Sequence, residues 1–141
     1  MKKIFSWILL CIVATVVVHA QKLSIPAAVL EAFKAKFPEA KKVKWGRENA
    51  KEYEAEFLLN NSKTSANFES GGKWIETESK ILITELPKVV SGAIVAQYKN
   101  CVITEAYRIE KPGGETVYEA DIKMTNKKKE VLLKEDGTFI K

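Results

Sequence analysis

The chain has 141 residues, including 23 Lys or Arg, 18 Asp or Glu and one His, and its formal net charge at pH 7 is +5. This length is sufficient for one compact unit with a hydrophobic core. Acidic and basic residues are interspersed, which favours a solvated surface over a nucleic-acid-binding face, where Lys and Arg gather on one side.

The amino terminus has the three parts of a secretory signal. Lys2 and Lys3 come first, an apolar run covers residues 8–18, and small residues occupy the two positions that a signal peptidase reads in Val18-His19-Ala20. The apolar run is shorter than the roughly 20 residues that a membrane span requires. We therefore predict a signal peptide at residues 1–20, cleavage between Ala20 and Gln21, a periplasmic or secreted location, and no membrane span after cleavage.

Cleavage removes His19 and Cys11 and leaves a chain with no histidine and one cysteine, Cys101. Without histidine, histidine-dependent nucleophilic catalysis and a zinc site of four Cys or His ligands are excluded. We expect no catalytic residues and no cofactor. Cys101 cannot form an intramolecular disulfide, and its place before a Val-Ile strand signal favours a buried, small apolar role.

Two amphipathic helices are predicted. Each begins near a proline, Pro26 or Pro87, which suits a first helical turn because proline lacks the N–H that would be unpaired there. Apolar residues then recur at every fourth position, which keeps them on one helical stripe. They are Ile25, Val29, Phe33 and Phe37 in the first helix and Leu86, Val90, Ile94 and Tyr98 in the second. Pro38 and Asn100 are the expected stops.

The segments after the helices alternate between apolar and charged residues, which is typical of antiparallel strands covered on one side. Residues 53–57 read Tyr-Glu-Ala-Glu-Phe, and residues 118–122 read Tyr-Glu-Ala-Asp-Ile. Turn residues separate the strands at 60–63, 71–72, 112–114 and 136–137. Lys127, Lys128 and Lys129 are expected at a hairpin tip with Thr125 and Asn126.

The chain is an internal duplication. The helices are 61 positions apart, and residues 53–57 and 68–75 match residues 118–122 and 133–140 at a common offset of 65. A longer hairpin near residues 111–114 accounts for the change of offset. We predict an α+β fold for residues 21–141, made of tandem repeats 25–80 and 86–141. Each repeat has one helix followed by an antiparallel meander of four strands, and together they form one sheet with both helices on one face and a shared core.

Strand parity places Glu54, Glu56, Glu119 and Asp121 on the open side of the sheet, with the carboxylates of each pair ~7 Å apart. This spacing is compatible with acid–base chemistry or a weak cation site. A solvated strand face balanced by lysines is the alternative, and the recurrence of the acids in both copies favours it.

Trp74, which is aligned with Phe139, has two possible roles. Burial of aromatic residues favours a core position. However, Trp74 and Ile75 are adjacent, so one of them must leave the buried face. The exposed one, with Phe139 and Ile140, would then be a partner contact on the open face.

These features resemble a known family. The helix, the meander and the closing segment Phe-Glu-Ser-Gly-Gly-Lys-Trp-Ile at residues 68–75 are similar to the PepSY-like domains of bacterial exported proteins. The tandem arrangement resembles the beta-lactamase-inhibitor-like group of Bacteroidetes. The resemblance covers Ile25 to Lys141 and implies a periplasmic or secreted, non-catalytic protein of two repeats that binds or restrains another protein.

The chain departs from the true beta-lactamase inhibitor protein, which is disulfide-bonded and inserts an acidic hairpin loop into its target. Here residues 21–141 cannot form an internal disulfide, and the tips at residues 60–63 and 125–128 carry no acid. We therefore expect an exported binding module that contacts an unidentified protein or cell-envelope component through the open sheet face. The alternative is a small-ligand or calcium-binding protein that uses the acidic strand face.

Overall fold

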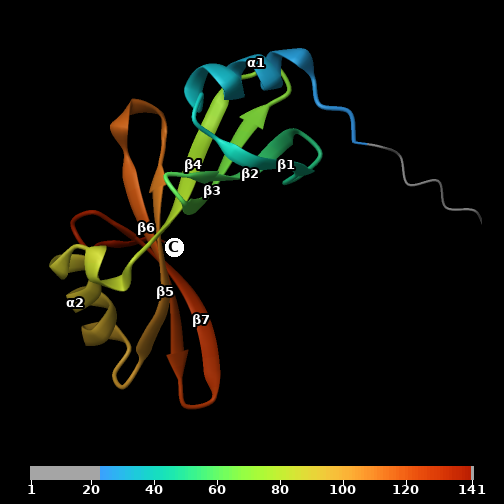
Figure 1. The fold of residues 1–141 in the computed structure, drawn as a ribbon. Coiled ribbons are helices and arrows are strands. Elements are labelled where there is room, and N and C mark those ends of the chain that lie inside the picture. The colour runs from blue at the N-terminus through green and yellow to red at the C-terminus, as the bar shows by residue number, and fades with distance from the viewer. Residues whose placement is uncertain (1–22, 141) are drawn as a thin grey trace, which may run out of the picture.

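The computed structural model describes residues 23–140, in which one α-helix followed by four β-strands occurs twice (Figure 1). The first set is α1 (Ala27–Lys36), β1 (Lys41–Arg47), β2 (Glu52–Leu59), β3 (Ser62–Glu69) and β4 (Trp74–Ile81). The second set is α2 (Lys88–Gln97), β5 (Val102–Glu110), β6 (Thr116–Met124), β7 (Lys127–Lys134) and β8 (Phe139–Ile140). The predicted signal peptide and the Ala20–Gln21 cleavage site lie outside the described residues.

Each helix is held by two residues on one stripe. Val29 and Phe33 of α1 are buried, as are Val90 and Ile94 of α2. Pro26 and Pro87 precede the first helical residue and occupy the N-cap position, one residue earlier than predicted. Both helices end before the expected stops, with the N–H of the C-cap residue bonded to the carbonyl oxygen of Phe33 or Ile94.

All eight strands form one antiparallel sheet in the order β1 to β8. Ala55 of β2 pairs with Ala66 of β3, and Ala66 pairs with Thr77 of β4. Four residues further along β4, Ile81 pairs with Ala106 of β5, which pairs with Ala120 of β6. Directly paired residues share a face, and so do residues four apart on one strand. Both helices therefore cover one face of the sheet, and the predicted α+β architecture is confirmed.

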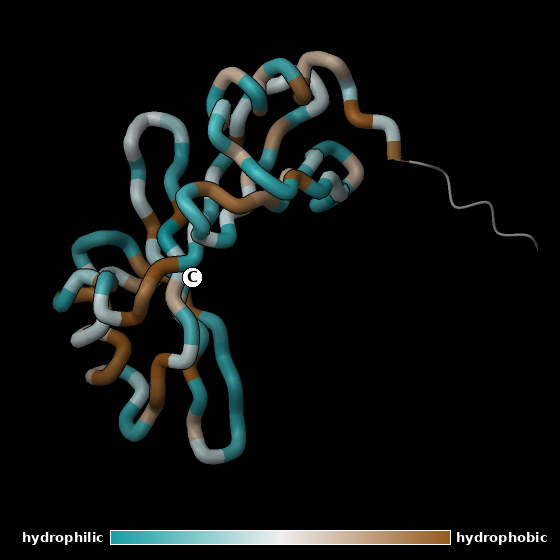
Figure 2. The backbone as a smooth tube through the Cα atoms, viewed as in Figure 1, coloured by the Kyte–Doolittle hydropathy of each residue, from teal (hydrophilic) through white to brown (hydrophobic). Residues whose placement is uncertain are grey.

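The expectation of a shared core is wrong. One cluster of buried residues surrounds Phe33, Phe57 and Phe68 under α1, and a second surrounds Ile94 and Leu133 under α2. Figure 1 shows the helices at opposite ends of the molecule, and apolar segments gather beside each of them in Figure 2. The sheet is long and twisted enough that each helix covers its own end of it, with only Ile81 at the end of β4 packing against the cluster of the other set among the residues named for the two clusters. Cys101 is half-buried against the second cluster.

Lys127 to Lys129 are exposed residues of β7 itself, and the turn before them is formed by Thr125 and Asn126. The lysine run is therefore next to the hairpin tip, in a strand. No helix among residues 23–140 is long and apolar enough to cross a membrane.

A glycine in each set lies against the first turn of the helix. Gly72 and Gly137 both have positive φ angles, 85° and 84°. A Cβ atom at Gly72 would lie 2.6 Å from the carbonyl oxygen of Ala28, and one at Gly137 would lie 3.0 Å from that of Val89. The turn before β4 and the turn before β8 thus approach α1 and α2 so closely that only glycine fits.

We expect Gly72→Ala to destabilise the protein by about 3 kcal/mol, because it adds a backbone clash to an unfavourable φ angle. Gly113 has the same φ of 85° but open space around it. Gly113→Ala therefore measures the cost of the unfavourable φ angle alone, ~1 kcal/mol. Gly71→Ala has neither and should be neutral within about 0.5 kcal/mol. Urea unfolding of the three variants checks this order, and equal losses at Gly72 and Gly113 would contradict the close-approach argument.

Candidate functional site

The face of the sheet away from the helices, here called the open face, carries acidic residues on most of its strands. Each pairs across the sheet with another open-face residue. They are Glu52, Glu54 and Glu56 on β2, Glu69 on β3, Glu76 and Glu78 on β4, Glu105 on β5, Glu119 and Asp121 on β6, and Glu130 on β7. The predicted outward direction of Glu54, Glu56, Glu119 and Asp121 agrees with this register.

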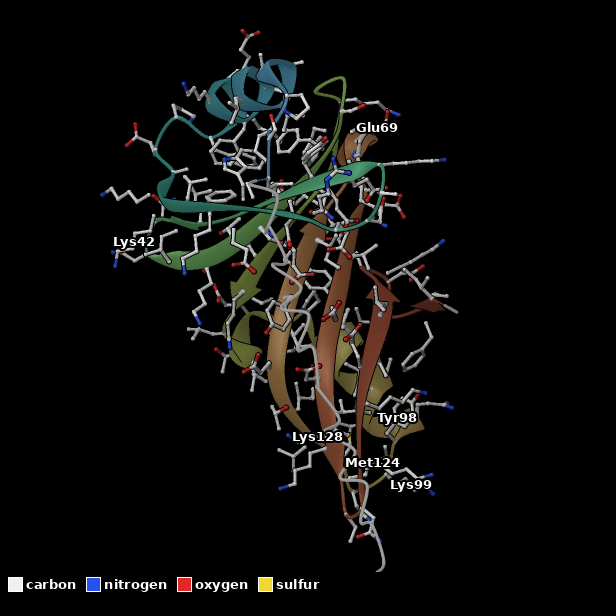
Figure 3. All side chains as sticks on the ribbon, turned by 90° about the vertical axis from the view of Figure 1, so that its right-hand side faces the viewer. Lys42, Glu69, Tyr98, Lys99, Met124 and Lys128 are labelled. Carbon is white, nitrogen blue, oxygen red and sulfur yellow. The ribbon has the colours of Figure 1, made fainter. Side chains whose placement is uncertain are left out.

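The open face is concave. In Figure 3, β1 and β2 project toward the viewer beneath α1, while β5 to β7 form a wall with α2 behind it. Ile109 and Val117 lie on the open face, yet they are only 4% and 1% exposed and belong to neither helix core. The sheet therefore curls around its middle strands and buries these two residues at the bottom of a trough. We call its acidic residues, Glu54, Glu76, Glu78, Glu119, Asp121 and Glu130, the acidic trough.

The curl brings carboxylates of distant strands within electrostatic range. Burial, and after it the charges of Glu78, Glu130, Asp121 and Glu76, together raise the pKa of Glu119 from 4.5 to about 7. Burial also raises the pKa of Glu78, as do the charges of Glu76 on β4 and Glu130 on β7. Strands β4 and β7 are separated by two others, so this coupling requires a strongly curved sheet.

Burial and the charges of Glu48 and Glu56 likewise raise the pKa of Glu54. The pKa of Glu54 on β2 is therefore raised, like that of its counterpart on β6, Glu119. Both disfavour the charged form because they are partly removed from water among other acids.

Basic residues neutralise the margins of the open face. Lys80 Nζ lies 2.9 Å from Glu105 Oε1, and Lys111 Nζ lies 3.6 Å from Glu76 Oε2. The Tyr107 hydroxyl also donates to Glu105, and this hydrogen bond lowers the pKa of that carboxyl. Among the described residues, no Lys or Arg forms an ion pair with Glu78, Glu119, Asp121 or Glu130. Glu78, Glu119 and Asp121 are therefore partly buried without an ion-pair partner, and Glu130 is an exposed acid without one.

Lysines also surround two open hollows on this face. One, of about 470 Å³, is lined by Glu54, Glu56 and Glu78 together with Lys42, Lys44 and Lys63. The other is lined by Glu105, Asp121 and Glu130 together with Lys123, Lys128 and Lys129. Lys42 and Lys128 mark opposite margins of the face in Figure 3. The surface thus has an acidic centre and basic margins.

Three trough residues could hold a cation. One carboxylate oxygen each from Glu119, Asp121 and Glu130 lie within 4.8 Å of one another. Oxygen ligands of this kind suit hard cations such as Ca²⁺. Residues 23–140 contain no histidine, so the Glu119 carboxyl group, despite its raised pKa, has no imidazole among them with which to form an acid–base pair.

Comparisons with known proteins agree with this architecture. The family described as "Putative beta-lactamase-inhibitor-like, PepSY-like" matches residues 15–61 and 51–141, which together make up most of the chain. The protein belongs to this PepSY-like family. The two overlapping matches are consistent with the internal repeat. No curated protein matches the sequence significantly.

Several solved structures are similar to this PepSY-like chain. A DUF2874 family protein from Bacteroides uniformis is 25% identical, with a TM-score of 0.75 over 82% of this chain and 86% of that one. A BLIP-like protein from Bacteroides fragilis is 23% identical, with a TM-score of 0.73 and 86% of each chain covered. A protein from Bacteroides eggerthii, described as periplasmic, is 20% identical, with a TM-score of 0.76 over 84% and 88%.

Trp74 and Phe139 do not lie on the open face, which corrects the hypothesis of an aromatic contact there. Trp74 pairs with Phe68 and packs against the first core. Phe139 pairs with Leu133 and lies edge-on to Tyr98, with ring centroids 5.9 Å apart. For Trp74 the reason is a β-bulge at Ile75, since the pairing jumps from Asn67–Glu76 to Phe68–Trp74 and leaves Ile75 unpaired. The pairing of β7 with β8 is regular and places Phe139 on the helix side without a bulge.

Sequence reasoning missed Glu76, Glu78, Glu105, Glu130 and Asn67 as members of the open face. For Glu76 and Glu78 a signal existed, because they alternate with Thr77 and Ser79 along β4. Strand alternation cannot reveal that the charge of Glu130 on β7 acts on Glu78 on β4 across the trough.

Trp74→Ala should destabilise the protein by about 2 kcal/mol, less than a fully buried aromatic costs, because the indole is half-buried. Its ring faces Lys36 Nζ at 3.5 Å, and its Nε1 donates to Thr77 Oγ1 at 3.0 Å. Trp74→Phe, the residue type of the second repeat, should keep most of this packing. Chemical denaturation measures both, and an unchanged midpoint for Trp74→Ala would mean that the side chain does not support the first core.

Glu119→Gln should raise the melting temperature at pH 8 and leave it almost unchanged at pH 4. The folded pKa of about 7 exceeds the ordinary 4.5, so between these values the folded state binds more protons than the unfolded state. The contribution of protonated Glu119 to the free energy of unfolding is therefore fully present below pH 4.5 and is lost as the pH rises toward 7. Melts of the variant, and of the exposed control Glu135→Gln, should diverge only above about pH 5.

Proposed function

We propose that this PepSY-like protein is an exported, non-catalytic binding module that contacts a protein or cell-envelope component through its acidic trough. The observation that carries the proposal is the group of partly buried carboxylates without ion-pair partners at the centre of a concave face. Glu54, Glu56, Glu119 and Asp121, the acids singled out from the sequence, are its proposed contacts, joined by Glu78.

The charge distribution favours a partner with a projecting basic segment. Carboxylates that are crowded and partly desolvated destabilise the unbound protein, and a Lys or Arg side chain placed among them would relieve that repulsion. The basic margins of the face would match acidic residues flanking such a segment. Leu132 is half-buried and Ile140 is 38% exposed on the same face, so they offer apolar contact to the aliphatic stems of lysines.

Two observations support export. The sequence begins with a pattern typical of a signal peptide, and a structurally similar protein from Bacteroides eggerthii is described as periplasmic. Residues 21–141 would then work outside the cytoplasm.

The hairpin tips do not support inhibition of a lactamase by an inserted acidic loop. The β2–β3 tip is a tight turn in which Asn60 and Asn61 both have positive φ, and Lys63 follows it. The β6–β7 tip leads directly into Lys127 and Lys128. These tips project amide and ammonium groups, so the proposed interface is the trough.

Cation binding is the second candidate function. The close approach of the Glu119, Asp121 and Glu130 oxygens favours it. A bound cation would neutralise the same charges that attract a basic partner, so the two functions would compete.

A lysine-rich peptide of about ten residues tests the basic-partner proposal. We expect binding that weakens as salt is added, because the contacts are electrostatic. The variant Glu78→Gln/Glu119→Gln/Glu130→Gln should bind on the order of tenfold more weakly. Fluorescence anisotropy measures the affinities.

The matched control is Glu31→Gln/Glu39→Gln/Glu135→Gln, which removes the same charge at exposed sites outside the trough. It should bind like the original protein. Equal weakening by both triple variants would show that overall charge, rather than the trough, attracts the peptide. Crosslinking in the native envelope with the same two variants then identifies captures that depend on the trough.

A further inference from the structure

Asn67 is a buried polar residue within the trough whose hydrogen bonding is incomplete. It lies on β3, paired with Glu54 on β2 and with Glu76 on β4, so the three side chains form one row across the open face. The side chain is only 9% exposed, and its Oδ1 atom has no hydrogen-bond partner among the described residues. Such a carbonyl oxygen has lost its water without gaining a donor, which is unfavourable unless something else binds it.

The fold itself does not require an amide at this place. The equivalent position in the second set is Leu132, which pairs with Glu119 as Asn67 pairs with Glu54. Leu132 is also partly buried on the open face. The fold therefore accepts an apolar side chain at the same position in the sheet, next to an equivalent glutamate. The polar side chain in the first set calls for a different explanation.

A cation supplies what the row lacks. Asn67 is flanked in the strand register by Glu54 on one side and Glu76 on the other, and Glu48 and Glu56 add negative charge around Glu54. Basic groups lie near the row as well: Lys111 Nζ is 3.6 Å from Glu76 Oε2, and Lys42, Lys44 and Lys63 line the same hollow as Glu54. A cation bound in the row would displace the Lys111 ion pair.

We propose that Asn67 Oδ1 and the carboxylates of Glu54 and Glu76 bind a calcium ion. Ca²⁺ accepts carboxylate and amide carbonyl oxygens in irregular arrangements, whereas Mg²⁺ demands a near-ideal octahedron and gives up its water reluctantly. The row has no sulfur or imidazole ligand that would favour zinc. This site lies elsewhere on the open face than the Glu119, Asp121 and Glu130 cluster, and the inference depends neither on that cluster nor on the basic-partner proposal.

Calcium titration of the purified protein at neutral pH, by calorimetry and thermal melts, tests it. We expect binding with a Kd on the order of 10⁻⁴–10⁻³ M, the range of weak extracellular sites, and a melting temperature that rises with calcium. Asn67→Leu, which installs the residue of the second set, should weaken calcium binding by about tenfold or more. Asn67→Asp keeps the oxygen ligand and should retain or strengthen binding.

The variant Glu119→Gln/Asp121→Asn/Glu130→Gln separates this site from the other acidic cluster, and under the proposal it keeps calcium-dependent stabilisation. If that variant loses stabilisation while Asn67→Leu keeps it, cation binding survives but the Asn67 assignment is wrong. If calcium affects none of the proteins, the cation-binding candidate function and the Asn67 site are both wrong. In EDTA, Asn67→Leu should melt at the same or a higher temperature. A lower one would mean that the amide serves the fold and would overturn the proposal.

Discussion

The antiparallel pairing of β4 with β5 is the interaction on which the rest of this structure depends. It joins the two sets of elements into one sheet, from Thr77–Glu110 to Ile81–Ala106. Because the register continues without a break in parity, α1 and α2 cover the same face although their cores are separate. The same parity sends the acids of both sets to the opposite face. One strand pairing therefore determines both where the cores lie and where negative charge accumulates.

Separate cores allow the sheet to curl. A helix spanning both sets would hold the middle strands flat, but each helix here covers one end of the sheet, so the middle of the sheet is free to bend. Bending buries Ile109 and Val117 and also desolvates Glu78 and Glu119. The first effect stabilises the fold and the second destabilises it. Such a balance is typical of a surface shaped for a ligand of opposite charge.

Local patterns were enough to predict the helices, the four-strand meanders, the single sheet and the outward direction of Glu54 and Glu119, because each depends on periodicity within one segment. The failures were non-local. The shared core was wrong because periodicity does not report how far a sheet twists. The bulge at Ile75 moved Trp74 to the helix face, and a bulge is not visible in the alternation of one strand. The trough depends on the curvature of the sheet, through which Glu130 of β7 acts on Glu78 of β4, and no single segment encodes that curvature.

The two sets also differ in a way that concentrates acidic residues at their junction. Glu54 and Glu119 recur, as do Glu56 and Asp121, so these pairs belong to the duplicated pattern and by themselves indicate only a solvated face. Strand β4 has eight residues and contributes Glu76 and Glu78, whereas its counterpart β8 has two. A symmetric duplication would produce two equal shallow faces. Because the acids of β4 face those of β6 and β7 across the junction, this chain has one trough. Asn67 lies in the part of the trough that the first set contributes, and the second set has Leu132 at the equivalent position.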